Sequence, residues 1–270
     1  MNIPSSCRIH PTAVIEDTAI LGEDVQVGPY AIVGPDVQVG PGCRISPHVV
    51  IEGVTTIGRN CQIFQFASIG AAPQDITYKG EKTCLNIGDN TIVRESVTIH
   101  RGTPKGGGTT EIGSECMIMA YSHIAHDCKI GNNVIMANVA TLGGHVEISD
   151  HAVIGGLSAI HQFCRIGRYA FLGGMSGANK DIPPYVKYQG QRANLFGINV
   201  LGLRRAGFPR EVIEALREAY RIVFSKAPTI TEGLELADQA YPDVAEVREF
   251  TDFIRQSKRG VPAGEWNNSQ

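Results

Sequence analysis

The chain has 270 residues, of which 43% are apolar and 19% are charged, so it is long enough to bury a core. Its formal net charge of −3 gives no electrostatic reason to expect nucleic acid as the main partner. No stretch approaches the roughly 18 apolar residues that a membrane span needs, and the first residues lack the apolar segment of a signal peptide. We therefore expect a cytoplasmic protein of one or two domains that does not span a membrane.

Seven cysteines are present, without any Cys-x-x-Cys pair. An odd number in a chain expected to be cytoplasmic favours free thiols over disulfides or a metal site. The 31 glycines and 14 prolines are spread at regular positions and form no low-complexity tract. Such spacing indicates a repeat.

An aliphatic residue or methionine recurs at every sixth position. The series runs from Ile3 to Ile69, resumes in phase from Ile87 to Ile99, and continues after a shift of one residue from Ile112 to Leu172. A helix of 3.6 residues per turn cannot hold a sixfold repeat on one face, whereas short strands joined by turns can. Hexapeptide repeats of this kind are typical of parallel β-helices.

A second column lies four residues after the first and holds only small or β-branched residues. Six of the seven cysteines, all but Cys84, fall in it, and we interpret them as packing residues of a narrow interior. A glycine commonly follows the aliphatic residue, as at Gly28 and Gly58, which suits either a positive φ or a close approach of two backbones. The repeat resembles the left-handed type of β-helix, in which three six-residue repeats form one triangular coil.

Two segments interrupt the repeat, residues 71–86 and residues 102–111. We interpret both as loops inserted into the coils, because acidic residues take the core positions of the first segment and the second shifts the phase by one residue. Loops on a rigid solenoid often hold binding residues, and a tolerated insertion is the alternative.

From residue 183 the sixfold register is lost and helix-forming residues dominate. We predict helices near 193–206, 210–225, 230–240 and 244–257, with prolines at the breaks. The sequence therefore predicts a mainly β chain with a left-handed parallel β-helix over residues 1–182 and a C-terminal α-helical domain over residues 183–270.

Four histidines are predicted to lie along one edge of three successive coils. Ile124, Leu142 and Ile160 are spaced by one coil and stack in one column, so the histidines near them share an edge. A single outward histidine is most often solvated, but four on one edge favour a functional site. The four are His123, His126, His145 and His161.

His126 is followed by Asp127, and an imidazole oriented by a carboxylate accepts a proton from a hydroxyl near neutral pH. Adjacent residues of a strand point to opposite faces, so direct pairing requires the corner of the coil to fold the carboxylate back. Gly144, beside the same edge, offers a backbone N–H that suits an oxyanion, although paired glycines more often only mark a turn.

Five segments and a short motif after them carry a specific resemblance to a known family. They read SIGAAPQDITYKGE (68–81), RESVTIHRGT (94–103), SHIAHDCKIGN (122–132), ATLGGHVEISD (140–150) and IGGLSAIHQFCRIG (154–167), followed by DIPPY (181–185). Over almost its whole length the chain resembles the UDP-N-acetylglucosamine (UDP-GlcNAc) acyltransferases of lipid A biosynthesis. The resemblance implies transfer of a 3-hydroxyacyl group from acyl carrier protein to the 3-hydroxyl of UDP-GlcNAc, the first committed step towards lipid A, without a cofactor or a metal.

The resemblance also implies roles for individual residues. His126 matches the general base of the family, Asp127 the residue that supports it, and Gly144 the amide at the developing oxyanion. Gly174 matches a position that sets acyl-chain length, and a small residue there favours a long chain. Positions that match substrate contacts are Gln74, Asp75, His123, His145, His161, Gln162, Asn199 and Arg205.

Two positions depart from the family pattern. Thr77 stands where relatives have a substrate-binding lysine, although Lys79 is near, and Leu201 replaces an acidic residue beside the nucleotide. The reaction class is unaffected, but a 3-amino sugar nucleotide, which would give an amide, is left open as an alternative acceptor. The exact length of the acyl chain is also left open.

The resemblance further implies a homotrimer with active clefts between neighbouring β-helices, and the flat faces of a solenoid suit such packing. Acyl carrier protein is acidic, so local cations should receive it despite the negative net charge. The candidates are Lys129, Arg165, Arg168, Arg204 and Arg205, and for all of them except Arg205 a solvated surface is the alternative interpretation.

Two other functions are compatible with a β-helix. A β-helical carbonic anhydrase binds zinc through histidines, and His123 and His126 could imitate such ligands. The matched loops and the helical end have no evident use in that enzyme. A rigid scaffold without activity is the second alternative, which loss of activity on replacing His126 would exclude.

Overall fold

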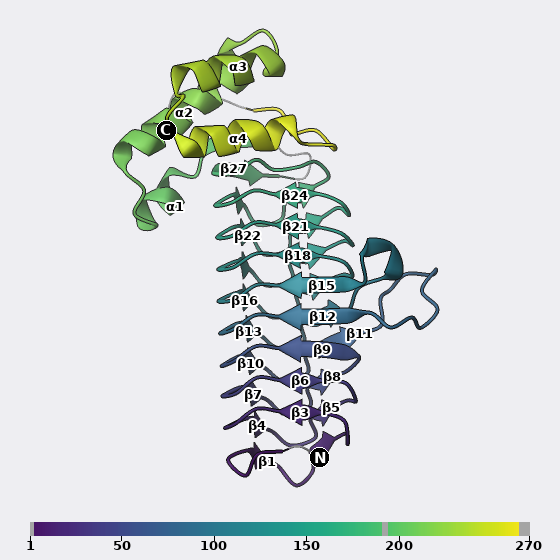
Figure 1. Cartoon of the computed structure of the whole chain (residues 1–270). Helices are drawn as coiled ribbons and strands as arrows, with labels where there is room; N and C mark the ends of the chain where they lie inside the picture. Colours follow the sequence, from purple (N-terminus) through teal and green to yellow (C-terminus); the bar gives the residue numbers. More distant parts are fainter. Residues whose placement is uncertain (1–2, 191–193, 265–270) are drawn as a thin grey trace.

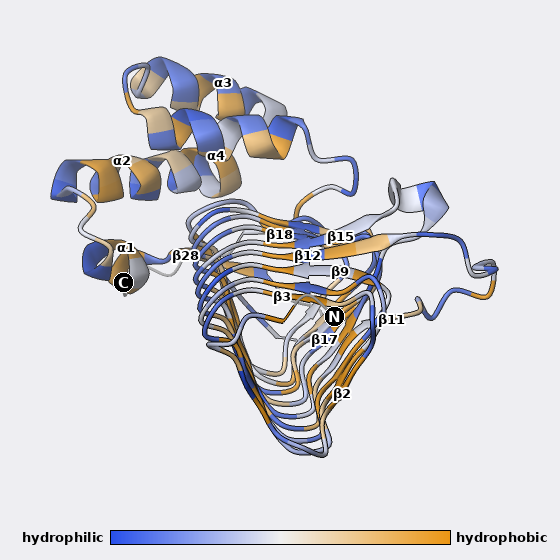
Figure 2. Ribbon diagram, turned by 60° about the horizontal axis from the view of Figure 1, so that its bottom comes forward, coloured by the Kyte–Doolittle hydropathy of each residue, from blue (hydrophilic) through white to orange (hydrophobic). Residues whose placement is uncertain are grey.

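The structure, a computed structural model, describes residues 3–190 and 194–264. The chain winds into a prism with a triangular cross-section, and each face of the prism is a parallel sheet whose strands come from successive coils (Figures 1 and 2). Helices lie at one end of the prism, and the N-terminus lies at the other (Figure 1). The predicted parallel β-helix with C-terminal helices is confirmed.

The three faces are built from every third strand in turn. The first face holds β1 (Arg8–Ile9), β4 (Gln26–Val27), β7 (Arg44–Ile45), β10 (Gln62–Ile63), β13 (Ile92–Val93), β16 (Met117–Ile118), β19 (Ile135–Met136), β22 (Val153–Ile154), β25 (Phe171–Leu172), β27 (Val186–Gln189) and β28 (Asn194–Ile198). The second face holds β2 (Val14–Ile15), β5 (Ile32–Val33), β8 (Val50–Ile51), β11 (Ser68–Ala71), β14 (Thr98–His100), β17 (His123–Ile124), β20 (Thr141–Leu142), β23 (Ala159–Ile160) and β26 (Gly177–Ala178). The third face holds β3 (Ile20–Leu21), β6 (Gln38–Val39), β9 (Val54–Ile57), β12 (Cys84–Ile87), β15 (Thr109–Ile112), β18 (Lys129–Ile130), β21 (Glu147–Ile148) and β24 (Arg165–Ile166).

The register between coils follows the sixfold repeat. Ile99 of β14 pairs with Ile124 of β17, which in turn pairs with Leu142 of β20. The aliphatic column is therefore continuous along each face, and from Leu21 to Leu172 its members are almost completely buried. The second column is buried as well, apart from the half-buried first coil, and all seven cysteines are free thiols.

The corners of the prism explain the role of the repeated glycines. Many corners carry a non-glycine residue in the left-handed region, for example Asp36 with a φ of 60° and Asn60 with a φ of 55°. The glycines after the aliphatic column instead permit close approach, because a Cβ on Gly40 would lie 2.6 Å from the carbonyl carbon of Gly58. Close backbone approach is therefore the general reason for these glycines, and Gly70, with a φ of 79°, is an exception that also needs the left-handed conformation.

Two loops project from the prism at the corner between the second and third faces (Figure 1). The first loop spans residues 72–83, between β11 and β12, and the second loop spans residues 101–108, between β14 and β15. The second loop contains a short 3-10 helix, η1 (Pro104–Gly106). Both loops are shorter than predicted, because the flanking strands extend into the segments 71–86 and 102–111.

The C-terminal part contains α1 (Val200–Arg205), α2 (Arg210–Arg221), α3 (Ile230–Ala240) and α4 (Ala245–Arg255). Helix α2 continues into a π-helical turn, η2 (Ile222–Lys226). The prediction of a helix from 193 to 206 is wrong in its first half, where β28 pairs antiparallel with β27; residue 193 itself lies outside the described part. The first face also continues past residue 182, because β27 pairs with β25.

A partly buried polar cluster attaches the helical end to the prism. Arg168 forms an ion pair with Glu249 of α4, with a shortest N–O distance of 2.7 Å. The Tyr185 hydroxyl hydrogen-bonds with both residues, and its ring is completely buried. In the part of the chain that is described, no helix is both long enough and apolar enough to cross a membrane.

Candidate active site

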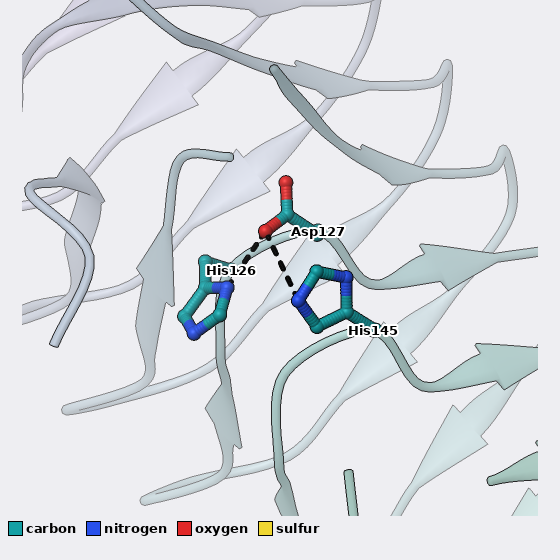
Figure 3. A group of neighbouring side chains, drawn as sticks. All are labelled: His126, Asp127 and His145. Atoms are coloured by element: carbon teal, nitrogen blue, oxygen red, sulfur yellow. Dashed lines mark hydrogen bonds and ion pairs between the residues drawn. The ribbon is translucent and has the colours of Figure 1, made fainter. Parts of the chain in front are cut away.

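His126 and Asp127 lie at the corner between the second and third faces, where both loops emerge. Asp127 adopts a left-handed conformation with a φ of 59°, which turns its carboxylate back towards the preceding residue. His126 Nδ1 is 2.7 Å from Asp127 Oδ2 (Figure 3). Adjacent residues of a strand point to opposite faces, but these two lie at a corner, where that alternation is broken. His126 and Asp127 can therefore pair directly.

The Asp127 carboxylate is completely buried and accepts several hydrogen bonds. Thr103 donates its backbone N–H to Oδ1 at 2.7 Å and its hydroxyl to Oδ2 at 2.6 Å. His145 Nε2 approaches the same Oδ2 at 3.6 Å (Figure 3). These contacts hold the carboxylate in one orientation, with Oδ2 towards the two imidazole rings.

The His126 ring is suited to accept a proton at Nε2. Asp127 accepts the hydrogen on Nδ1, so the network assigns the tautomer with a free lone pair on Nε2. The side chain is 16% exposed, and none of the residues described here hydrogen-bonds with Nε2. This nitrogen is therefore available to a bound hydroxyl.

Gly144 lies directly against the His126 ring. A Cβ on Gly144 would be 2.6 Å from Cε1 and 2.9 Å from Nε2 of that ring. The Gly144 N–H has no hydrogen-bond acceptor among the described residues. The site thus combines a proton acceptor with a free amide donor, as acyl transfer requires.

The other predicted histidines have different surroundings. His145 stacks on Phe163 at 4.4 Å and meets the His126 ring edge-on at 5.2 Å. His123 Nδ1 is 2.7 Å from the Thr98 hydroxyl, and burial lowers the pKa of both His123 and His145. His161 and Gln162 are exposed, and Arg259 reaches His161 Nδ1 at 3.3 Å.

A fifth histidine of this corner was not predicted. His100 is 5% exposed and meets His123 edge-on at 4.9 Å, and its Nδ1 has no partner in the described part of the chain. Burial lowers the pKa of His100 to about 4, and the charge of His123 adds to the effect. The signal was available, because His100 follows Ile99 as His161 follows Ile160.

The first loop places Asp75 near the same corner. Asp75 accepts hydrogen bonds from the backbone N–H of Thr77 at 2.8 Å and from its hydroxyl at 2.9 Å, which lowers the pKa of Asp75. Lys105 of the second loop donates to the Thr77 hydroxyl at 3.0 Å. The cation beside Thr77 is therefore Lys105 rather than Lys79, while Gln74 is exposed to solvent.

Asn199 and Arg205 do not join the histidines. They line a separate cavity of about 1000 Å³ at the corner between the third and first faces, together with the exposed Leu201. His151 and Tyr169 stack at 4.5 Å in the same cavity and were not predicted. Figure 2 shows α1 and the projecting loops at different corners of the prism.

Gly174 lies at the remaining corner, between the first and second faces. A Cβ on Gly174 would be 3.3 Å from the carbonyl oxygen of Gly156 and would meet no other backbone within 3.4 Å. A small side chain at this position would therefore be in tight contact with the Gly156 carbonyl but would need only a small shift of the backbone. No single chain brings Gly174 together with His126, since they occupy different corners.

The arrangement of side chains around His126 argues against zinc binding by His123 and His126. In the described part of the chain, one group of three potential metal ligands has its ligand atoms within 4.8 Å of one another. It consists of His126, Asp127 and His145 and does not include His123. Both Asp127 oxygens already accept hydrogen bonds from Thr103. This donor set favours an acid–base site over the proposed pair of zinc ligands.

Comparisons with known proteins agree with this site. A family model described as UDP-N-acetylglucosamine O-acyltransferase, domain 2, matches residues 181–262, and one described as bacterial transferase hexapeptide (six repeats) matches residues 18–53 and 109–144. A relative from Halorhodospira halophila, named acyl-[acyl-carrier-protein]–UDP-N-acetylglucosamine O-acyltransferase, is 54% identical over 254 residues. The match covers 94% of this chain and 98% of the relative. The chain belongs to the UDP-N-acetylglucosamine O-acyltransferase family.

Solved structures of this acyltransferase family match over nearly the full chain. LpxA from Acinetobacter baumannii is 45% identical with a TM-score of 0.91, covering 94% of this chain and 99% of that one. The UDP-N-acetylglucosamine acyltransferase from Arabidopsis is 36% identical with a TM-score of 0.83, covering 95% and 100%. The family recognised from the five sequence segments is confirmed.

The buried His100 predicts a pH-dependent stability. The unfolded chain binds a proton at this imidazole near pH 6.5, whereas the folded chain does so only near pH 4. The free energy of unfolding should therefore fall as the pH drops through this window, by up to about 3 kcal/mol from this group. Urea denaturation at a fixed protein concentration measures this free energy at each pH. Between pH 6.5 and pH 4 it should fall less for His100→Gln than for the parent protein. If the free energies of unfolding of parent and variant changed in parallel with pH, the effect could not be assigned to His100.

Proposed function

We propose that this acyltransferase moves a 3-hydroxyacyl group from acyl carrier protein to the 3-hydroxyl of UDP-GlcNAc, the first step of lipid A biosynthesis. The observation that carries the proposal is the pairing of His126 with the buried Asp127 beside the free amide of Gly144. The relative from Halorhodospira halophila is named for the same donor and acceptor. A cytoplasmic location, expected from the sequence, stays a prediction.

The reaction we propose is a direct attack without an acyl-enzyme. His126 Nε2 takes the proton of the sugar hydroxyl as its oxygen attacks the thioester carbonyl carbon. Negative charge then develops on the carbonyl oxygen, where the Gly144 N–H stabilises it. The carbon–sulfur bond breaks, and the carrier thiolate receives the proton from His126. Asp127 stabilises the imidazolium that forms between these steps.

Substrate contacts follow from the placement of the remaining residues. Asp75, His123 and His145 lie around the corner that holds His126, and we assign them, with Gln74, to the sugar and its surroundings. Arg205 has an exposed guanidinium that can bind a phosphate with two hydrogen bonds, and Asn199 lies in the same cavity. His161 and Gln162 remain candidates for the nucleotide or the carrier arm.

We propose a homotrimer in which each active site is shared between two chains. Within one chain Asn199 and Arg205 occupy a different corner from His126, so a complete site requires a second copy. The remaining corner carries a column of exposed apolar side chains, 39% to 65% exposed, that a partner would cover. They are Tyr30, Phe66, Tyr121, Val139, Leu157 and Met175.

The carrier protein is expected to meet a subset of the predicted cations. Arg168 pairs with Glu249, and Arg165 lies near Glu147 and over the ring of Phe253, so both are engaged within the chain. Lys129, Arg204 and Arg205 form no ion pair within the described residues. We therefore place the acidic carrier near these three cations.

Replacing His126 tests the mechanism. His126→Ala should lower kcat by about 10²- to 10⁴-fold, because no other group can take the hydroxyl proton at that position. The control is His10→Ala, because His10 is exposed and lies in the first coil, several coils away from His126; this variant should keep full activity. Full turnover by a folded His126→Ala protein would refute the mechanism and would support the scaffold alternative.

The acceptor atom can be identified directly. Purified protein should convert UDP-GlcNAc and a 3-hydroxyacyl carrier protein into an ester. When carrier proteins with acyl chains of different lengths are supplied together, mass analysis of the products should show that a long chain is transferred preferentially. The 3-amino analogue should react more slowly, because the family is one of O-acyltransferases. Exclusive use of the amino analogue would show that Thr77 and Leu201 have changed the acceptor.

Mixed assemblies test whether sites are shared. His126→Ala chains and Arg205→Ala chains should each have little activity alone, and coexpression should restore activity because some clefts combine intact residues from both. If each chain formed its own site, every site in the mixture would carry one defect and no activity would return. Light scattering of the mixture should report the mass of a trimer.

A further inference from the structure

The second loop, residues 101–108, encloses the Asp127 carboxylate. Its residue Thr103 is 2% exposed, and the two hydrogen bonds from Thr103 reach both carboxylate oxygens. The oxygen that accepts the Thr103 hydroxyl is the same Oδ2 that accepts from His126 Nδ1. The loop therefore contacts the supporting residue of the general base, not only the space where substrate binds.

The two bonds from Thr103 determine the rotation of the carboxylate. A carboxylate held at only one oxygen can turn about its Cβ–Cγ bond, whereas donors on both oxygens leave one orientation. In that orientation Oδ2 lies 2.7 Å from His126 Nδ1. Because the backbone donor and the hydroxyl donor come from one residue, Thr103 fixes the carboxylate in plane.

Gly106 supplies an independent observation of the same enclosure. A Cβ on Gly106 would lie 2.0 Å from Asp127 Cγ and 2.2 Å and 2.4 Å from its two oxygens. Only a glycine can pass this close to the carboxylate. The Gly106 N–H also bonds back to the Thr103 hydroxyl oxygen at 3.3 Å, which orients that hydroxyl towards Asp127.

We propose that Thr103 is a positioning residue for the acyl transfer, acting through Asp127 on His126, and that Gly106 permits the contact. The proposal rests on the proposed function. Thr103 is 2% exposed and its side chain bonds with Asp127 and Gly106, so its loss should affect the rate of the chemical step and not the binding of UDP-GlcNAc. The second loop is then part of the catalytic apparatus rather than a tolerated insertion.

Thr103→Val keeps the shape and the backbone N–H while removing the hydroxyl. We expect kcat to fall by about ten- to a hundred-fold, the usual effect of losing such a supporting hydrogen bond, with KM for UDP-GlcNAc unchanged. Thr103→Ser restores the hydroxyl and should recover most of kcat. An unchanged kcat in Thr103→Val, a change confined to KM, or a failure of serine to restore activity would each overturn the proposal.

Thr251→Val is the matched control. Thr251 is also completely buried and donates its hydroxyl at 2.7 Å to a carboxylate, that of Asp238, but in the helical end of the chain. A purely structural role for Thr103 would make the two variants behave alike. We expect Thr251→Val to lower the melting temperature and leave kcat unchanged, and equal losses of kcat in both would contradict a positioning role.

Gly106→Ala provides a second test if Thr103→Val does not fold. The added methyl group removes no hydrogen-bonding atom but displaces the Asp127 carboxylate, so kcat should again fall with KM unchanged. Full activity of Gly106→Ala would refute the enclosure. The parent protein is assayed first: an inactive parent would count against the proposed function, whereas an active parent with unaffected variants would count against Thr103 alone.

Discussion

Core, corners and site all follow from the register between successive coils. Each strand is only a few residues long, and it is held by backbone hydrogen bonds to the coils above and below it. A shift of one residue would turn the aliphatic column to solvent and the polar positions inward. The sixfold repeat of the sequence shifts by one residue between Ile99 and Ile112, across the second loop, and the pairing of Ile87 with Ile112 keeps the aliphatic column in register.

The same register builds the active corner. One coil separates His126 from Gly144 and Asp127 from His145, so the stacking of coils brings each pair into contact. The corner conformation of Asp127 then turns the carboxylate towards its own neighbour. The contacts among His126, Asp127, Gly144 and His145 thus arise from the repeat itself, and the loops add further hydrogen-bond donors. Thr103 and Lys105, both from the second loop, are the clearest examples.

The residues proposed to bind substrate lie at different corners of the prism, and the helical end positions two of them, Asn199 and Arg205. Helix α1 is capped by Asn199, whose side chain accepts from Gly202 N–H and donates to the carbonyl of Tyr169 on the prism. This contact sets Arg205 at a corner that His126 does not share. A rigid prism cannot bend to bring two corners together. The shared site that we propose would be completed by packing of one prism against another.

Much of the fold followed from the sequence, because the sixfold period depends on local alternation of side chains that any strand must obey. The same period placed His123, His126 and His145 on one edge. The helix predicted from 193 was wrong in part, since pairing of β28 with β27 overrides local propensity.

Contacts that cross a loop could not be read from the sequence. The bond from Thr103 to Asp127 joins residues 24 apart, and the bond from Lys105 to Thr77 joins residues 28 apart in two separate loops. Loop closure depends on packing rather than on period. The repeat in the sequence is therefore enough to predict the coil, its core and the edge that holds His126. The tertiary structure alone decided how the carboxylate is held, because that depends on which distant donors the folded corner brings within reach.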